Sequence, residues 1–198
     1  MIQKAVLEQL YVHDKLSMMQ ISQTLTCSPH KVGYWMMKYD IERRSISDAV
    51  YEKSNPNGDP FKMKGITSQD DAFLLGMGIG LYWGEGNKRN KHPVRLGNTD
   101  PVIIKMFIKF LVDICGIRKD KLRFNLQILS DIEPAKALEY WVEELDEPKE
   151  KFNKITVTTA RSIGTYRYKN QTGVSTVCFH NYKLRDIIVG LCRDSSVG

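Results

Sequence analysis

The chain has 198 residues, of which 42% are hydrophobic and 26% charged, so it is long enough for one larger or two small domains and too apolar to be disordered. Its net charge of +6 and pI of about 9.1 favour polyanionic partners. The four cysteines form no CxxC pair, which excludes a disulfide framework and a zinc finger, and no segment suits a signal peptide or a membrane span, so we expect a cytoplasmic, intracellular protein.

The first 48 residues predict three helices. Apolar residues at helical spacing mark the first helix, and Ser17 opens a short second one. Ser28 is a good N-cap and Pro29 suits the first helical position, so a third helix begins there and runs to about Tyr39. These residues are expected to form a domain of their own.

This order of helix, tight turn and helix resembles the DNA-binding helix-turn-helix of resolvases and transposases. Thr26 stands where that family usually has a turn glycine. The resemblance implies that the third helix enters the major groove of DNA, and its outward side offers donors to phosphates and base edges. These candidate DNA-binding residues are Ser28, His30, Lys31, Tyr34 and Lys38. A plain three-helix bundle with a solvated polar face is the alternative.

Residues 49–69 are predicted to be a linker. They contain a run of polar and helix-breaking residues, Ser54-Asn55-Pro56-Asn57-Gly58-Asp59-Pro60. The second domain is then expected to span residues 70–198.

The second domain opens with a strongly apolar helix, which has no charged residue from Ala72 to Trp83. A helix that is apolar on every side is expected to be buried, and this one is shorter than the ~20 residues that span a bilayer. Its glycines, Gly76, Gly80 and Gly84, share one face. Glycine within a helix costs ~1 kcal/mol relative to alanine, so this face predicts close packing against a second helix, of this chain or of a second copy. Glycines that let the helix cross its own sheet are the alternative.

Residues 78–86, which read Gly-Ile-Gly-Leu-Tyr-Trp-Gly-Glu-Gly, resemble the motif of LAGLIDADG homing endonucleases. Three residues match the motif outright: Gly80, Leu81 and Gly86. Glu85 falls at the position of the family's metal-binding acid, whereas Trp83 replaces an earlier, more variable acid. In that family two such helices pack through small residues and their acids meet beneath the DNA. The resemblance therefore implies a homodimer formed through Gly76, Gly80 and Gly84.

The remaining pattern predicts an α+β fold. Strands are expected at 94–98, 122–128, 155–158 and 174–179, and helices at 102–114, 133–145 and 182–191. The expected architecture is a three-helix helix-turn-helix followed by a LAGLIDADG-type α/β domain. The resemblance implies a saddle-shaped antiparallel sheet with helices on one face. Alternation places one set of side chains on the open face of that sheet: Arg95, Arg123, Asn125, Gln127, Lys154, Thr156 and Thr158. Residues 131–150, with eight acids against two lysines, are expected to form an acidic back.

The resemblance further implies a homing endonuclease that binds double-stranded DNA sequence-specifically and cuts it with a metal ion. Glu85 is expected to ligate Mg²⁺, and Lys154 or Gln127 to order the attacking water. Further DNA contacts are expected from Lys88, Arg89, Arg95, Arg123, Asn125, Arg161 and Arg167. A transcription regulator of the same fold that does not cleave DNA is the first alternative, and a protein-interaction module is the second.

Overall fold

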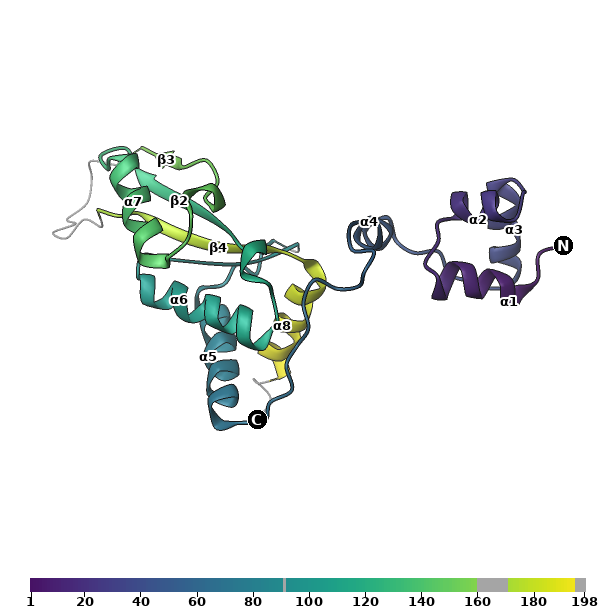
Figure 1. The fold of residues 1–198 in the computed structure, drawn as a ribbon, viewed down its shortest axis with the longest axis horizontal. Coiled ribbons are helices and arrows are strands. Elements are labelled where there is room, and N and C mark those ends of the chain that lie inside the picture. Colours follow the sequence, from purple (N-terminus) through teal and green to yellow (C-terminus); the bar gives the residue numbers. More distant parts are fainter. Residues whose placement is uncertain (91, 160–170, 195–198) are drawn as a thin grey trace. The chain divides into compact units, whose positions relative to one another are not determined.

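The computed structural model describes residues 1–90, 92–159 and 171–194 (Figure 1). The fold is α+β, with helices and a four-stranded mixed sheet. The chain divides into two compact units, Met1–Asp59 and Pro60–Gly198, which are described separately below. Within the described ranges, no helix combines the length and the apolar character that a membrane crossing requires.

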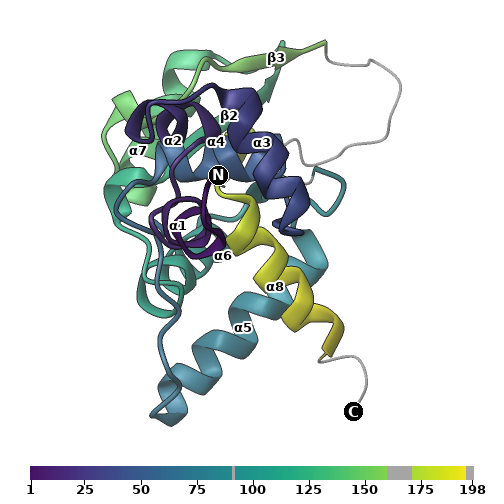
Figure 2. The same ribbon diagram turned by 90° about the vertical axis from the view of Figure 1, so that its right-hand side faces the viewer.

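The first unit contains the three predicted helices. They are α1 (Lys4–Leu7), which continues as a π-helical segment (Glu8–His13), α2 (Met18–Thr24) and α3 (Pro29–Lys38) (Figure 2). Ser17 and Gln20 form a reciprocal capping box at the start of α2, and the Ser28 hydroxyl accepts from the backbone N–H of Lys31 at the start of α3. The core between the helices is closed by Leu7, Ile21, Val32 and Met36, which are fully buried.

The turn between α2 and α3 passes through the left-handed region at Thr26, where φ is 49°. A β-branched residue in this region is an outlier. The sequence places Thr26 where a turn glycine is usual, and the backbone angle gives the physical reason for that usage.

A fourth helix, α4 (Ile46–Ser54), crosses the predicted end of the first domain at residue 48 and lies partly in the predicted linker. Arg44 fastens it to the rest of the unit. The Arg44 guanidinium pairs with Glu52 of α4, donates to the carbonyl oxygens of Tyr11 and Leu16 at 3.1 and 2.6 Å, and lies 4.3 Å from the Tyr11 ring centroid. The helix lacks an apolar stripe facing the core, so its sequence carries little helical periodicity.

The second unit carries the sheet. Its helices are α5 (Gln69–Glu85), α6 (Pro101–Lys109) with a π-helical extension (Phe110–Ile114), α7 (Pro134–Leu145) and α8 (Tyr182–Asp194). Its strands are β1 (Pro93–Asn98), β2 (Arg123–Leu129), β3 (Thr156–Thr158) and β4 (Val174–His180). Two short 3-10 helices, Lys119–Lys121 and Lys149–Lys151, precede β2 and β3.

The strand order is β1-β4-β2-β3. Strand β4 pairs antiparallel with both β1 and β2, but β3 pairs parallel with β2. The prediction of a wholly antiparallel sheet is therefore wrong at this edge. The chain passes from β2 to β3 through α7, and such a crossover returns the chain in the same direction.

Helices cover one face of the sheet. Helices α5, α6 and α8 lie on the same side of it in both views (Figures 1 and 2). The strands turn their apolar side chains to this side, where they join one hydrophobic core with the helices, including Val94, Leu96, Phe124, Leu126, Ile128, Val177, Phe107, Trp141 and Leu184. The opposite face therefore remains for polar side chains.

Helix α5 starts at the N-cap Ser68 and buries one face through Leu74, Gly78 and Tyr82. A Cβ atom at Gly78 would lie 2.1 Å from the Phe110 ring, so Gly78 is the glycine that packing within this chain requires. The other face is open: the side chain of Phe73 is 62% exposed and that of Trp83 is 49% exposed. The prediction that this helix is buried on all sides is wrong for a single chain.

The predicted glycine face lies on this open side. Cβ atoms at Gly76, Gly80 and Gly84 would meet nothing within 4 Å among the described residues. Packing of a second helix of this chain against these glycines is therefore wrong for the described part of the chain, as is close crossing of its own sheet. Packing against a second copy stays a prediction.

Candidate functional site

An open groove of about 380 Å³ lies where the C-terminal end of α5 meets the polar face of the sheet. Its walls come from α5, the turn after it and all four strands. The lining residues are Glu85, Asn87, Arg95, Gly97, Asn125, Leu126, Gln127, Thr156 and Thr176. The groove joins one carboxylate to amides, hydroxyls and a guanidinium, which is the chemistry of a polar ligand.

Gly86 places Glu85 at this groove. It ends α5 in an extended conformation and pairs with Leu96 of β1. A Cβ atom at Gly86 would lie 2.3 Å from the Tyr82 carbonyl oxygen, so only glycine lets the chain turn this closely onto β1. The last residue of the helix is thereby held against the open face of the sheet.

Hydrogen bonds from Tyr82 and from helix α8 hold the turn that follows α5. The Tyr82 hydroxyl donates to the Asn87 carbonyl at 3.1 Å, and the Arg185 guanidinium of α8 donates to the Lys88 carbonyl at 2.8 Å. The backbone N–H of Asn87 donates to the Arg95 carbonyl at 2.9 Å. Burial raises the pKa of Tyr82, and the nearby Arg185 partly offsets that shift, so Tyr82 is a neutral donor. The Asn87 side chain is thus held at the groove.

A positive charge lies at the C-terminal end of α5, which is the negative end of the helix dipole. The Lys88 ammonium donates to the Trp83 carbonyl and lies 4.7 Å from the Trp83 ring centroid. Arg95 lines the groove together with Glu85. Within the described residues no cation lies at ion-pair distance from the exposed Glu85 carboxylate, so it remains available to a ligand.

The floor of the groove follows from strand register. Gly97, Thr176 and Asn125 lie side by side on β1, β4 and β2. A Cβ atom at Gly97 would lie 2.6 Å from the Thr176 hydroxyl, so the glycine makes the floor hollow. In the next row Gln127 donates to the Thr158 hydroxyl at 3.1 Å, which fixes its amide.

In the row that crosses the sheet two residues before Gly97, Arg95 of β1 pairs with the buried Cys178 of β4, and the exposed His180 lies two residues further along β4. The Arg95 Nε donates to Cys178 Sγ at 3.2 Å, and Cys178 Sγ lies 3.3 Å from His180 Nε2. Burial raises the pKa of the Cys178 thiol, while Arg95 opposes that shift. Partial burial and the charge of Arg95 lower the pKa of His180. Both residues are therefore neutral at pH 7. The charge of this row comes from Arg95 and from Arg123, which pairs with Cys178 from β2.

The groove gathers four predicted site residues: Glu85, Gln127, Arg95 and Asn125. Lys154 is exposed before β3 and does not line the groove, and Lys88, Arg89 and Arg123 are exposed outside it. Arg161 and Arg167 lie outside the described residues. Sequence reasoning missed Asn87, Gly97 and Thr176. The alternation of β4 could have identified Thr176, whereas Asn87 depends on contacts that no periodicity encodes.

In the first unit, the predicted DNA-binding side chains His30, Lys31, Tyr34 and Lys38 are all exposed along α3. Lys38 lies 5.0 Å from the Trp35 ring centroid. Ser28 is also exposed, but its hydroxyl oxygen accepts from the backbone of Lys31 as the N-cap. The Ser28 hydroxyl proton therefore remains available to donate a hydrogen bond to a ligand.

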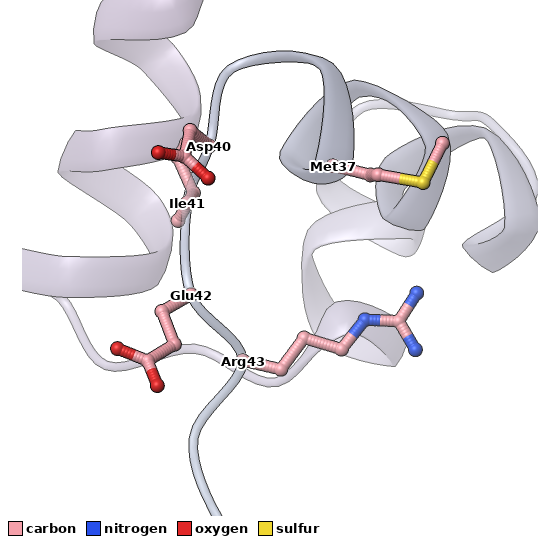
Figure 3. A pocket seen from close by; sticks show the side chains of 5 residues that line it. All are labelled: Met37, Asp40, Ile41, Glu42 and Arg43. Atoms are coloured by element: carbon pink, nitrogen blue, oxygen red, sulfur yellow. The ribbon is translucent and has the colours of Figure 1, made fainter.

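The first unit also has a hollow of about 610 Å³ after α3, lined by Met37, Asp40, Ile41, Glu42 and Arg43. Figure 3 shows that the polar ends diverge, with Asp40 and Glu42 on one side of the backbone and Arg43 on the other. These groups do not converge on a common ligand atom, so the groove at Glu85 is the better candidate.

No group of three or more His, Cys, Asp or Glu side chains that could hold a metal ion occurs in residues 1–90, 92–159 and 171–194. The groove therefore offers one carboxylate per chain. Comparisons of the chain with protein-family models, curated proteins and solved structures found no match.

Proposed function

We propose that this protein binds double-stranded DNA on the polar face of its sheet and cuts it in a metal-dependent reaction, as a homing endonuclease of the single-motif LAGLIDADG kind. The observation that carries the proposal is the position of Glu85. It is the last residue of α5, which carries no other charge after Asp71, and it lines a groove together with Arg95, Asn125 and Gln127.

The groove suits nucleic acid better than a small apolar ligand. Arginine, asparagine and glutamine side chains form paired hydrogen bonds with guanine and adenine edges, and arginine also binds phosphate. The groove is open and its lining is mainly polar, whereas sites for small molecules are mostly concave and apolar. The basic charge of the chain is consistent with a polyanionic partner.

The donor set fits Mg²⁺ if DNA supplies the rest of the ligands. Mg²⁺ is usually bound through one or two carboxylates, several waters and substrate phosphates, rather than by an all-protein cage. Glu85 would be the anionic ligand. The amide oxygen of Asn125, which accepts one hydrogen bond from Asn153, would be a neutral one, whereas that of Asn87 already accepts from the backbone N–H groups of Arg89 and Asn90. The bound ion would lower the pKa of a water and neutralise charge on the leaving oxygen. Gln127, whose amide is fixed by Thr158, would orient the attacking water.

A second copy of the chain would supply the second carboxylate. The open face of α5 presents Gly76, Gly80 and Gly84, and the rings of Phe73 and Trp83 on the same helix are also exposed. Close approach of two such helices would bring two Glu85 residues together beneath one duplex. The first unit, as a helix-turn-helix, would add contacts through Lys31 and Tyr34 of α3.

A transcription regulator that binds the same way without cutting is the second candidate. Trp83 favours it, because it stands where the resemblance expects another acid and leaves one carboxylate per chain at the groove.

The deciding experiment measures binding and cleavage of duplex DNA, drawn from the sequence that flanks the gene and from a random pool, in Mg²⁺ and in Mn²⁺. Glu85→Gln keeps the size of the side chain and removes its charge. Cleavage should fall by about a hundredfold or more, because several kcal/mol of charge stabilisation is lost at 1.36 kcal/mol per tenfold. Binding should persist or tighten, because one negative charge near the phosphates is gone.

Glu139→Gln, at an exposed position of α7, makes the same charge change away from the groove and should leave cleavage unchanged. Equal cleavage by wild type and Glu85→Gln would place the active site elsewhere. Binding without cleavage by the wild type, in either metal, would favour the regulator. Loss of binding in Lys31→Ala would assign α3 to the DNA contact.

A further inference from the structure

Seven cationic side chains gather at the end of the sheet where β2 begins, outside the groove. They come from residues 118–123 and 147–154, which carry seven Lys and Arg against three Asp and Glu. We name this surface the basic rim, which consists of Arg118, Lys119, Lys121, Arg123, Lys149, Lys151 and Lys154. Neither segment is conspicuous by itself in the sequence, since acids interrupt both.

The fold fastens the two segments together. The ring of Phe124 stacks on that of Phe152 with centroids 5.0 Å apart, and the backbone N–H of Asn153 donates to the Phe124 carbonyl at 2.8 Å. The Lys151 ammonium donates to the Lys119 carbonyl at 3.0 Å. The basic rim is therefore one surface made from two parts of the chain.

Glu147 is the buried anchor of the basic rim. Its side chain is 2% exposed, and its carboxylate lies 2.6 Å from the Lys151 ammonium and 3.3 Å from that of Lys119. This carboxylate compensates two of the cations and holds their side chains in place. Arg118 pairs with Asp120 at 2.9 Å, so Lys121, Arg123, Lys149 and Lys154 are the cations of the basic rim that no carboxylate compensates among the described residues.

The outer cations are available to a ligand. Lys121, Lys149 and Lys154 are exposed, and in the described part of the chain none of the three takes part in an ion pair. Among the residues that the structure describes, the Arg123 guanidinium donates only to the carbonyl oxygens of Asp120 and Leu122, which orient it without neutralising it. Uncompensated like charges in one place repel one another, so binding of a polyanion there is favourable.

The basic rim is continuous with the groove. Arg123 and Asn125 lie on the same face of β2, two residues and therefore ~6.7 Å apart. Asn153, next to Lys154, donates to the Asn125 side chain at 2.7 Å. A duplex that reaches Asn125 in the groove can thus continue over the basic rim without leaving the protein surface.

We infer that the basic rim is a second contact for the phosphate backbone of duplex DNA, beside the groove that contains Glu85. This inference rests on the proposed DNA binding. The cations are distributed over two segments, which suits the repeated charges of a backbone better than one small anion. They contact no base edges, so they add affinity and hold the duplex in the groove without reading its sequence.

The test is the salt dependence of binding by the full chain to a random-sequence duplex. Lys121→Ala, Lys149→Ala and Lys154→Ala are combined in one variant. If each lysine contacts one phosphate, the slope of log K against log salt becomes shallower by up to about 2.7, which is about 0.9 per contact. The corresponding Lys→Arg variant should retain the wild-type slope. Thermal unfolding verifies that each variant folds.

The matched control combines Lys105→Ala, Lys109→Ala and Lys136→Ala, which removes the same charge from exposed helical positions where each lysine pairs with an acid. Its slope should equal that of wild type. Equal slopes in wild type and the rim variant would overturn the inference and leave DNA binding intact. Equal changes of the slope in both triple variants would show that only the net charge of the protein matters, and would overturn the basic rim as a specific contact. A wild type that binds phosphatidylserine vesicles but no duplex would overturn this inference and the proposed function together.

Discussion

At the scale of single residues, Thr26 carries a backbone strain that the rest of the first unit must outweigh. Its φ of 49° lies in the left-handed region, which costs a residue with a Cβ atom about 1–2 kcal/mol. Glycine removes that cost but loses about 0.5–1 kcal/mol through greater freedom of the unfolded chain.

Thr26→Gly should therefore stabilise the first unit by about 0.5–1 kcal/mol. The free energy of unfolding, measured by urea titration, checks this. Thr24→Gly makes the same substitution at the last residue of α2, where it should destabilise by a few tenths of a kcal/mol, the difference between the two helix propensities. A lower stability of Thr26→Gly than of wild type would contradict the argument.

Buried charge supplies another example at this scale. Glu147 joins Lys119 and Lys151 beneath the basic rim, and sequence alone could not have set it apart from the seven other acids of residues 131–150. Helical periodicity identifies which face of a helix is apolar. It does not identify an acid that follows the helix, becomes buried and pairs with Lys119, 28 positions earlier in the chain.

At the scale of elements, the start of α5 is fixed by a polar network. Asp71 lies 2.8 Å from the Lys64 ammonium, and its carboxylate also accepts from the backbone and hydroxyl of Thr67. The hydrogen bond from Lys64 is the main reason why the pKa of Asp71 lies below its ordinary value of 3.8. The network ties the helix to the segment that begins the second unit.

The stability of this unit should therefore depend on pH at the acid end. Because the pKa of Asp71 is lower in the folded state, the unfolded state binds the proton more readily. The contribution is fully present above the ordinary Asp pKa and is lost as the pH falls below 3.8 and through the folded value. Thermal melts between pH 7 and pH 2.5 should show a steeper acid decline for wild type than for Asp71→Asn.

Asp70→Asn, at the neighbouring exposed position of the same helical turn, is the control and should decline in parallel with wild type. Identical profiles for wild type and Asp71→Asn would show that the Lys64 pair contributes nothing to folding.

Which elements form could largely be predicted, because helix starts and strand alternation are local signals. Ser17, Ser28 and Ser68 cap their helices as the residue types indicate. The direction of β3 was not predictable, since three β-branched residues at the edge of a sheet pair equally well in either direction. Helix α4 was missed because its outward face is apolar, with Ile46 86% and Val50 59% exposed.

At the scale of the whole molecule, the open face of α5 is the surface through which two chains would pair and bring two grooves together. The sequence predicts close packing on Gly76, Gly80 and Gly84, and the described chain places nothing there. The glycine spacing did not identify Gly78. This residue contacts Phe110, and the contact joins two helices that only the tertiary fold brings together. Spacing identifies a face, but it does not identify the partner of that face.

Gly80→Leu should convert a dimer into a monomer, because the added side chain separates two helices that meet at this face. Its Cβ would meet nothing within 4 Å among the described residues of one chain, so folding of the monomer should be unaffected. Sedimentation velocity with and without DNA measures the change. Ala135→Leu enlarges an exposed residue of α7 and should leave the mass unchanged. A wild type that is monomeric under both conditions would contradict the pairing of Glu85 residues.

The strand order has a consequence for how the protein is made. Strand β4 lies at the centre of the sheet, between β1 and β2, yet it is the last of the four strands in the chain. Its pairing joins Pro93 to His180 and Arg123 to Cys178, which are 87 and 55 residues apart. Contacts this distant close late and slowly, whereas the hydrogen bonds that join the first unit span fewer residues, such as the 37 between Ile2 and Tyr39. During synthesis the first unit can fold early, while β1 and β2 emerge with their pairing edges open until β4 is translated. Premature termination before residue 174 would therefore yield a chain in which the first unit is folded and the unpaired strands β1 and β2 are prone to aggregate.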